Sequence, residues 1–284
     1  MTPTQVGPLL REWRERRRLS QLELAVEAGV SARHVSFVEN GRARPSPEMV
    51  LHLAERLDVP LRERNQLLLS AGYAPVYGQR TLDDAGMEPV RNAIELVLAG
   101  HEPYPALVVD QHWTMVAANR GLAVITDGVA PELLEPPVNV LRVALHPDGL
   151  ATRIVNLAEW RTHLLERLDR QIAATNDPVL VKLRDELTGF PAPASDGREG
   201  HGVGVAGTAA HGNGNGAGKR PATTGAQLAS DIVVSLRLRV GDAELAFFST
   251  IATFGTAVDV TISELAIESF FPADRFTAEY LQSR

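Results

Sequence analysis

The chain of 284 residues contains no cysteine. Disulfide scaffolds, thiolate zinc sites and cysteine nucleophiles are therefore excluded. Long hydrophobic runs are also lacking, because the longest uncharged apolar stretch, residues 245–258, carries Ser, Thr and Gly and is too short to span a bilayer. Residues 1–7 lack the basic-then-apolar pattern of a secretory signal. We therefore expect a soluble, cytoplasmic protein without membrane insertion.

The composition is that of a folded protein with an uneven distribution of charge. Hydrophobic residues make up 44% of the chain, which is enough for a packed core and excludes a wholly disordered chain. The net charge is −7, yet residues 1–80 contain 12 Arg against 9 acidic residues, whereas residues 81–284 contain 16 basic and 26 acidic residues. A basic N-terminal part indicates an anionic partner for that part. Ordinary helix-surface charge is an equal alternative.

Short helical periodicities dominate the first 75 residues. Ser20 is placed to cap a helix, with Glu23 three residues later to complete a capping box. Gly29 then ends this helix as a left-handed residue, and Ser31 caps the next one. The pattern predicts a compact all-α domain of five helices, near residues 6–19, 21–28, 32–39, 48–57 and 62–71.

From residue 100 onward the pattern changes to α+β. Residues 106–110 and 113–118 resemble a β-hairpin, and residues 119–190 return to helix, most clearly at 156–174. Apolar residues alternate from residue 234 to 240, and Gly241-Asp242 predicts a two-residue turn. Two more strands are expected at 244–254 and 258–269, the second with a bulge near Glu264. Residues 192–226 contain ten Gly and are read as a flexible insertion loop.

A helix-turn-helix pattern gives the strongest functional signal. It runs from Gln21 to Gly41, with a helix, a Gly turn and a second helix that presents Val30, Val35 and Val38 to the core. Any helical bundle shows such an apolar stripe, so the polar residues at specific positions carry more weight. Residues 7–72 resemble the Cro/phage-repressor (Xre) family of helix-turn-helix proteins, which implies that double-stranded DNA is a partner.

The resemblance assigns roles to individual positions. It implies that the amide of Gln21, at the start of the second helix, holds a phosphate. It also implies a structural ion pair between Arg14 and Glu39. Arg33 is the candidate for reading guanine and Phe37 for a thymine methyl group. Relatives often carry amide side chains where this chain has Ala32 and Phe37, so their base preference does not transfer. The resemblance also places Asn40, Arg42 and Arg44 where relatives touch the DNA backbone. The predicted DNA-binding residues are Gln21, Ser31, Ala32, Arg33, Ser36, Phe37, Asn40, Arg42 and Arg44.

The second domain lacks a catalytic signature. No His-Glu-x-x-His, Gly-x-Ser-x-Gly or Walker A sequence occurs in the chain. Residues 202–207 satisfy Gly-x-Gly-x-x-Gly, but they lie in the Gly-rich segment with neither a strand before nor a helix after them, so a dinucleotide site is not indicated. The eight His are scattered without metal-ligand spacing. We therefore expect neither an enzyme nor a cofactor or metal.

Residues 100–190 and 228–282 resemble the ligand-binding domain of MmyB-like regulators. The likeness rests on residues 103–110, 113–120, 137–142, 145–147 and 153–160, and the Gly-rich insertion departs from the family pattern. The resemblance implies a PAS-like fold whose pocket takes a fatty acid or related lipid. The expected fold class is therefore α+β. A five-helix helix-turn-helix domain (1–75) is followed by a linker and connecting helix (76–99). A PAS-like domain (100–284) then contains an antiparallel sheet of about five strands.

A lipid carboxylate would need a cation or hydrogen-bond donors at the pocket mouth. Each candidate also has a structural alternative: Asn139 can cap a helix, Arg142 and Arg153 can be surface charges, and Trp160 can be core. The predicted ligand-binding residues are Asn139, Arg142, Arg153, Asn156, Trp160, Phe247 and Phe248.

The resulting hypothesis is a homodimeric DNA-binding regulator whose acyl ligand alters DNA binding. One alternative is a C-terminal domain that serves only for dimerisation, with its pocket filled by its own side chains. An enzyme domain fused to a DNA-binding module is a second alternative, which the missing acid, base and nucleophile motifs disfavour.

Overall fold

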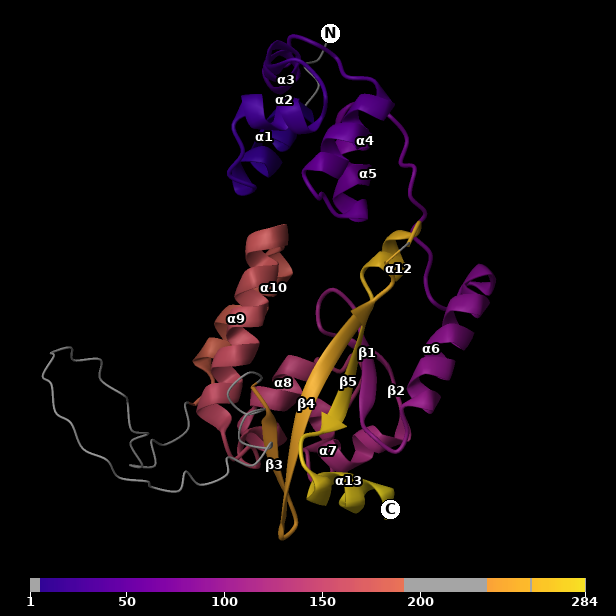
Figure 1. Ribbon diagram of the computed structural model, residues 1–284, viewed down its shortest axis with the longest axis vertical. Coiled ribbons are helices and arrows are strands. Elements are labelled where there is room, and N and C mark those ends of the chain that lie inside the picture. The colour runs from indigo at the N-terminus through magenta and orange to yellow at the C-terminus, as the bar shows by residue number, and fades with distance from the viewer. Residues whose placement is uncertain (1–5, 192–233, 256, 284) are drawn as a thin grey trace, which may run out of the picture.

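The computed structural model describes residues 6–191, 234–255 and 257–283. A small all-helical domain lies at one end of the molecule, and a larger domain built on a twisted sheet lies at the other (Figure 1). The predicted α+β class is therefore confirmed. The insertion predicted at 192–226 lies outside the described residues.

The N-terminal domain contains the five predicted helices, and its core is the set of apolar residues that the helical spacing identified. Leu10, Trp13 and Leu24 are buried, as are Val35 and Val38, whereas Val30 is half-buried against the same core. The helices are α1 (Val6–Arg16), α2 (Gln21–Glu27), α3 (Ala32–Glu39), α4 (Pro47–Arg56) and α5 (Leu61–Ser70).

Local capping explains why α2 and α3 begin where they do. The Ser20 side chain accepts a hydrogen bond from the backbone N–H of Glu23, whose carboxylate accepts one from the backbone of Ser20, so the predicted capping box is present. Ser31 caps α3 by accepting from the N–H of His34. Gly29 lies between the two helices with a φ of 63°, a conformation that glycine adopts without steric cost.

A buried ion pair fixes α3 against α1. Arg14 donates hydrogen bonds from Nε and Nη2 to the two carboxylate oxygens of Glu39, at 2.7 and 2.9 Å. Gln21 adds a third hydrogen bond, from Nε2 to Oε2 of Glu39 at 2.8 Å, so α2 joins the same contact. This pairing raises the pKa of Arg14 above its ordinary value. The ion pair that the family resemblance implied is thus present, and it orients α3.

The C-terminal domain is built on one antiparallel sheet. The five described strands lie in the order β2-β1-β5-β4-β3, and the predicted turn at Gly241-Asp242 joins β3 to β4, with Val240 paired to Ala243. The strands are β1 (Ala106–Val109), β2 (Met115–Ala118), β3 (Leu236–Val240), β4 (Ala243–Thr253) and β5 (Ala266–Pro272).

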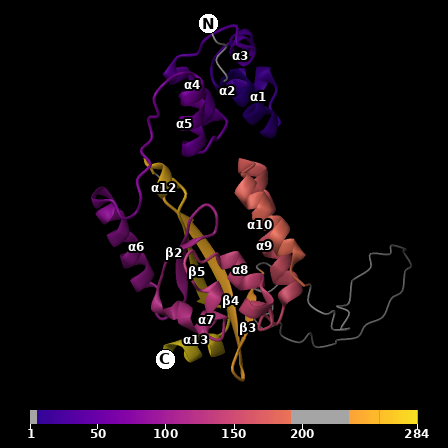
Figure 2. The same cartoon turned by 180° about the vertical axis from the view of Figure 1, so that it is seen from behind.

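Helices cover both faces of this sheet (Figures 1 and 2). One helix, α6 (Glu88–Gly100), packs Ile94 and Leu98 on one face of β1 and β5. The opposite face carries the larger core, which includes Trp160 and Leu164. The remaining helices are α7 (Ala123–Thr126), α8 (Val140–Leu145), α9 (Leu157–Thr175), α10 (Pro178–Gly189), α12 (Val260–Ser263) and α13 (Arg275–Gln282).

The strand expected at 258–269 was wrong in its first half. Residues 260–263 form the short helix α12, and β5 begins only at Ala266. Asp259 causes the change, because its side chain caps α12 by accepting from the N–H of Thr261 at 2.9 Å. The break in alternation near Glu264 is therefore the end of a helical turn rather than a β-bulge.

The Arg14–Glu39 pair should be essential to the stability of the N-terminal domain. The side chains are 9% and 2% exposed, and removal of one partner from such a buried pair costs about 3 kcal/mol. We expect Glu39→Ala to lower the Tm of this domain by about 10 °C or more in calorimetry. Glu15→Ala removes the exposed partner of Arg11 and only a longer contact, of 3.8 Å, to Arg14, so it should leave the Tm nearly unchanged. Equal effects of the two variants would contradict this assignment.

Candidate functional site

The outer surface of α3 presents the residues predicted to read DNA. Ser31, Arg33 and Asn40 are exposed, while Ser36 and Phe37 are half-buried, as is Ala32. The guanidinium of Arg33 lies 5.0 Å from the centre of the Phe37 ring, a cation–π contact that orients the long side chain. Arg33 therefore combines exposure with a defined position at the N-terminal part of α3, where recognition helices of this motif contact base edges.

The predicted phosphate-binding residues differ in their surroundings. The Gln21 amide donates to Glu39, so its described donor contact is structural. Arg44 donates from Nη2 to the carbonyl oxygen of Ala71 at 3.2 Å and lies over the ring of Tyr73. Arg42 is exposed, and its side chain has no polar partner among the described residues. Phosphate contacts by Gln21, Arg42 and Arg44 stay predictions. Of the three, Arg42 is the one whose side chain has no other polar partner among the described residues.

A cavity of about 80 Å³ lies in the C-terminal domain between the sheet and the helices α7, α8 and α9. Its walls are almost entirely apolar. The eighteen lining residues are Leu107, Trp113, Met115, Leu122, Ile125, Thr126, Leu134, Val138, Val140, Leu141, Val143, Ala144, Leu150, Trp160, Leu164, Leu236, Glu268 and Phe270.

Of the predicted ligand-binding residues, only Trp160 lines this cavity. Asn139 caps α8 and donates a hydrogen bond to the carbonyl oxygen of His112. It therefore has the helix-capping role that the sequence predicted as the alternative to ligand binding. Arg142 makes a two-point ion pair with Glu186 of α10, at 2.7 and 2.8 Å, on the outer surface. That pairing raises the pKa of Arg142. These polar side chains therefore do not gather at a pocket mouth.

The other predicted residues also have structural partners or face different sides of the sheet. Arg153 donates to the carbonyl oxygens of Ile125 and Arg239, and Asn156 donates to that of Ser235, so both connect loops to β3. Phe247 is buried in the core, whereas Phe248 stacks on Phe271. Neighbouring residues of a strand point to opposite faces, so Phe247 and Phe248 do not share one pocket wall.

Sequence reasoning missed the charged residue of the cavity. Glu268 lies on β5, is 6% exposed, and faces Arg167 of α9. Arg167 in turn lies 4.2 Å from the ring centre of Trp113. The available signal was a Glu within the apolar stretch that forms β5, at a position whose alternation places it on the same face as Phe270.

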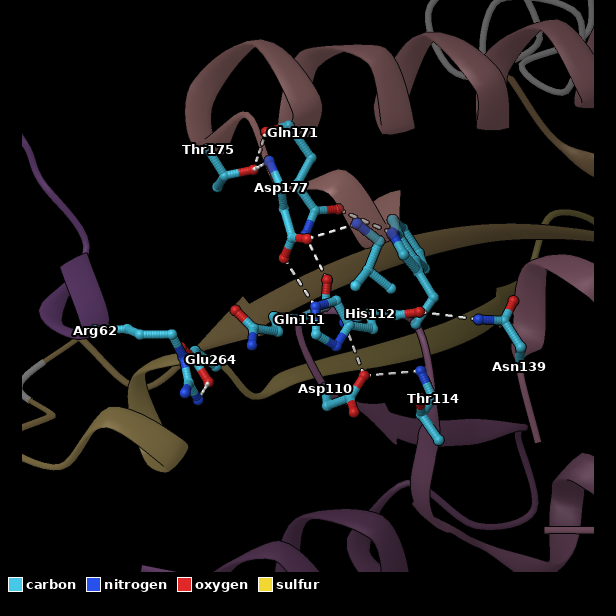
Figure 3. Close-up of polar contacts among 12 residues, drawn as sticks. Arg62, Asp110, Gln111, His112, Thr114, Asn139, Gln171, Thr175, Asp177 and Glu264 are labelled. Carbon is cyan, nitrogen blue, oxygen red and sulfur yellow. Dashed lines mark hydrogen bonds and ion pairs between the residues drawn. The ribbon is translucent and has the colours of Figure 1, made fainter. Parts of the chain in front are cut away.

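Two polar side-chain contacts join the described parts of the two domains. Arg62 of α5 donates from Nε and Nη2 to the carboxylate of Glu264, just after α12, at 2.7 and 2.8 Å (Figure 3). Arg16 of α1 donates to the carbonyl oxygen of Thr175, at the end of α9, at 3.3 Å. A polar cleft of about 520 Å³ lies between the domains. Burial beside this cleft raises the pKa of Glu63.

A chain of hydrogen bonds runs from the cavity to this interface. Trp113, in the cavity wall, donates from Nε1 to the side-chain oxygen of Gln171 at 2.8 Å. Gln171 donates to the carbonyl oxygen of Gln111, and its own carbonyl oxygen accepts from Thr175 (Figure 3). Thr175 is the residue that Arg16 contacts from the N-terminal domain. The end of α9 is therefore connected to both the cavity and the helix-turn-helix domain.

A helix-turn-helix domain followed by an α+β domain with an apolar cavity is the arrangement of a transcriptional regulator with a DNA-binding and a ligand-binding domain. Comparison with protein families agrees with this class. Residues 90–283 match the MmyB-like transcription regulator ligand binding domain, and residues 10–64 match a helix-turn-helix family. The chain therefore belongs to the MmyB-like transcription regulators.

Two curated relatives come from Bacillus subtilis (strain 168). The chain is 43% identical over 68 residues to the HTH-type transcriptional repressor RghR, which covers 24% of this chain and 48% of the relative. It is 33% identical over 103 residues to the uncharacterized HTH-type transcriptional regulator RghRB, which covers 36% of this chain and 66% of that relative. The chain thus spans about half the length of the first relative and just under two thirds of the second.

Two other classes of site are not seen in the described part of the chain. None of its helices is long and apolar enough to cross a membrane. In residues 6–191, 234–255 and 257–283, no cluster of three or more His, Asp or Glu side chains is arranged to hold a metal ion.

Arg33 and Arg42 should affect DNA binding in different ways. We expect Arg33→Ala to weaken binding to the specific site by about tenfold or more, since one good contact to a base contributes roughly 1–3 kcal/mol of discrimination. Arg42→Ala should weaken binding to all sequences alike and reduce the salt dependence by about one unit of slope. Fluorescence anisotropy with specific and scrambled duplexes, over a range of salt, separates the two effects. Unchanged discrimination by Arg33→Ala would contradict its assignment.

Proposed function

We propose that this protein is a sequence-specific DNA-binding transcriptional regulator that acts as a homodimer. The exposed Arg33 on a recognition helix held by the Arg14–Glu39 pair is the observation that supports it most. Two copies would place their recognition helices in two half-sites roughly one helical turn apart. The basic N-terminal part would add the electrostatic attraction to phosphates that such binding needs. No enzymatic activity belongs to this proposal.

We further propose that the cavity binds a fatty acid or related lipid. Its support is the apolar lining, in which Glu268 is the one ionisable side chain of the eighteen. Burial of each methylene of such a ligand contributes roughly 0.8 kcal/mol. However, the cavity of about 80 Å³ is smaller than the roughly 300 Å³ of ordinary small-molecule sites, so a long chain requires the walls to move apart.

Movement of the cavity walls is also the step by which a ligand would act on the DNA-binding domain. The walls include α9 and β5, and both continue to the domain interface, α9 through Thr175 and β5 through the preceding Glu264. A ligand that separates α9 from the sheet would therefore disturb the two interdomain contacts. The coupling is allosteric only if the ligand binds the two domain arrangements with different affinities.

The small cavity also favours a second candidate function. In this alternative the C-terminal domain only mediates dimerisation, and its own side chains fill the pocket. Phe270, Leu164 and Trp160 already occupy much of the space between β5 and α9. The two candidates differ in whether the purified protein contains or accepts a small molecule.

Mass spectrometry of the purified, washed and denatured protein separates these candidates. We expect recovery of an apolar lipid in near-stoichiometric amount. The control is the same extraction from an unrelated protein purified in parallel. Recovery of nothing, together with no rise in Tm when fatty acids are added, would remove the lipid from the proposal and leave the dimerisation platform.

The Arg62–Glu264 contact should carry the effect of the ligand to the DNA. We expect Glu264→Ala to reduce the ligand-induced change in DNA affinity several-fold, because typical coupling between sites is about 5- to 150-fold. Glu186→Ala is the matched control, since it removes an equally short two-point pair, with Arg142, that lies within the C-terminal domain. DNA affinity is measured with and without ligand for both variants. Equal coupling in both would argue against this route.

A further inference from the structure

Glu268 is the only ionisable side chain that lines the apolar cavity among the described residues. It lies on β5, opposite Leu107 of β1 and Ile251 of β4 in the sheet register, and its side chain is 7% exposed. A carboxylate in such surroundings is costly to bury unless its oxygens accept hydrogen bonds. Its partners therefore determine what the cavity can bind.

The one ion pair of Glu268 is long. Arg167 Nη1 lies 3.4 Å from each carboxylate oxygen, whereas the Arg62–Glu264 and Arg142–Glu186 pairs have two contacts of 2.7 and 2.8 Å. Hydrogen bonds from charged nitrogen to carboxylate are normally about 2.7–2.9 Å long. Arg167 therefore reaches Glu268 only through long hydrogen bonds from one nitrogen, so each carboxylate oxygen keeps capacity to accept a further hydrogen bond.

Arg167 is positioned by other groups and does not itself line the cavity. Its guanidinium lies over the ring of Trp113, and burial lowers its pKa below the ordinary value. His163 and Arg170 of α9 also lie near this pair. Burial, and then the charge of Arg167, lowers the pKa of His163. Arg167 donates two long hydrogen bonds to Glu268 through Nη1, and neither Arg167 nor His163 lines the cavity.

We infer that Glu268 selects the polar end of the ligand, and that the cavity takes an apolar molecule whose polar end donates hydrogen bonds, such as a hydroxyl group or a protonated amine. This inference rests on the proposed function and narrows the ligand from a fatty acid to a related lipid with a hydrogen-bond donor at its polar end. A donor end satisfies the free lone pairs of Glu268 in a low-dielectric site. An ionised carboxylate would instead face a second carboxylate at close range, which is a repulsive element of the kind that gives binding sites their specificity.

A series of ligands with one chain and three polar ends tests the inference. Octylamine, 1-octanol and octanoate are titrated into the wild-type protein at pH 7 by calorimetry. We expect octylamine and 1-octanol to bind about tenfold or more tightly than octanoate. This is the effect on affinity expected when one ligand donates a hydrogen bond to a charged group and the other does not. Glu268→Gln should weaken octylamine by about tenfold and strengthen octanoate. Glu186→Gln, outside the cavity, should preserve the wild-type order.

The outcomes distinguish this inference from the function on which it rests. If octanoate binds most tightly to the wild-type protein, the inference is overturned while a lipid-binding function stands. If none of the three compounds binds, both fail. An unchanged order in a folded Glu268→Gln protein also overturns the inference. Should that variant fail to fold, the order of affinities in the wild-type protein decides alone.

Discussion

The small contact between the two domains is the constraint on which the proposed regulation of this protein depends. Arg62 and Glu264 form one side of it, and Arg16 with the carbonyl oxygen of Thr175 forms the other, on either side of a polar cleft. The side chains of Arg62 and Glu264 are 33% and 14% exposed, so this pair is partly buried. An interface of so few polar contacts nevertheless leaves the domains able to move relative to one another. Each domain, by contrast, has its own apolar core and keeps its shape when the contact changes.

The cavity is bounded by elements that extend to this interface. Its walls include α9 and β5, whose ends lie near the helix-turn-helix domain (Figure 1). In the proposed mechanism, these two elements would carry a change in wall separation to the interface. The hydrogen bonds from Trp113 through Gln171 to Thr175 add a direct polar connection. A cavity too small for a long ligand and an interface too weak to resist movement together fit a two-state device.

The sequence predicted those features that depend on local chemistry. Ser20, Gly29 and Ser31 set the helix boundaries through neighbours within a few residues, and the alternation in β3 placed its turn correctly. The ligand-binding residues were harder to predict. Arg142 pairs with Glu186, which lies 44 positions further along the chain, and residue spacing carries no information over such a separation. Glu268 was missed for the same reason, since Arg167 approaches it from another element.

Because the chain contains no cysteine, a ligand-induced change in the arrangement of the two domains can be measured directly with introduced labels. Spin labels on the double variant Glu55→Cys and Glu166→Cys, both at exposed positions, report the distance between α4 of the DNA-binding domain and α9 of the ligand-binding domain without background labelling. Pulsed electron paramagnetic resonance is recorded with and without a bound ligand. We expect the distance distribution to shift when ligand binds, because movement of the cavity walls would disturb the two interdomain contacts. An unchanged distribution with the cavity occupied would contradict this expectation.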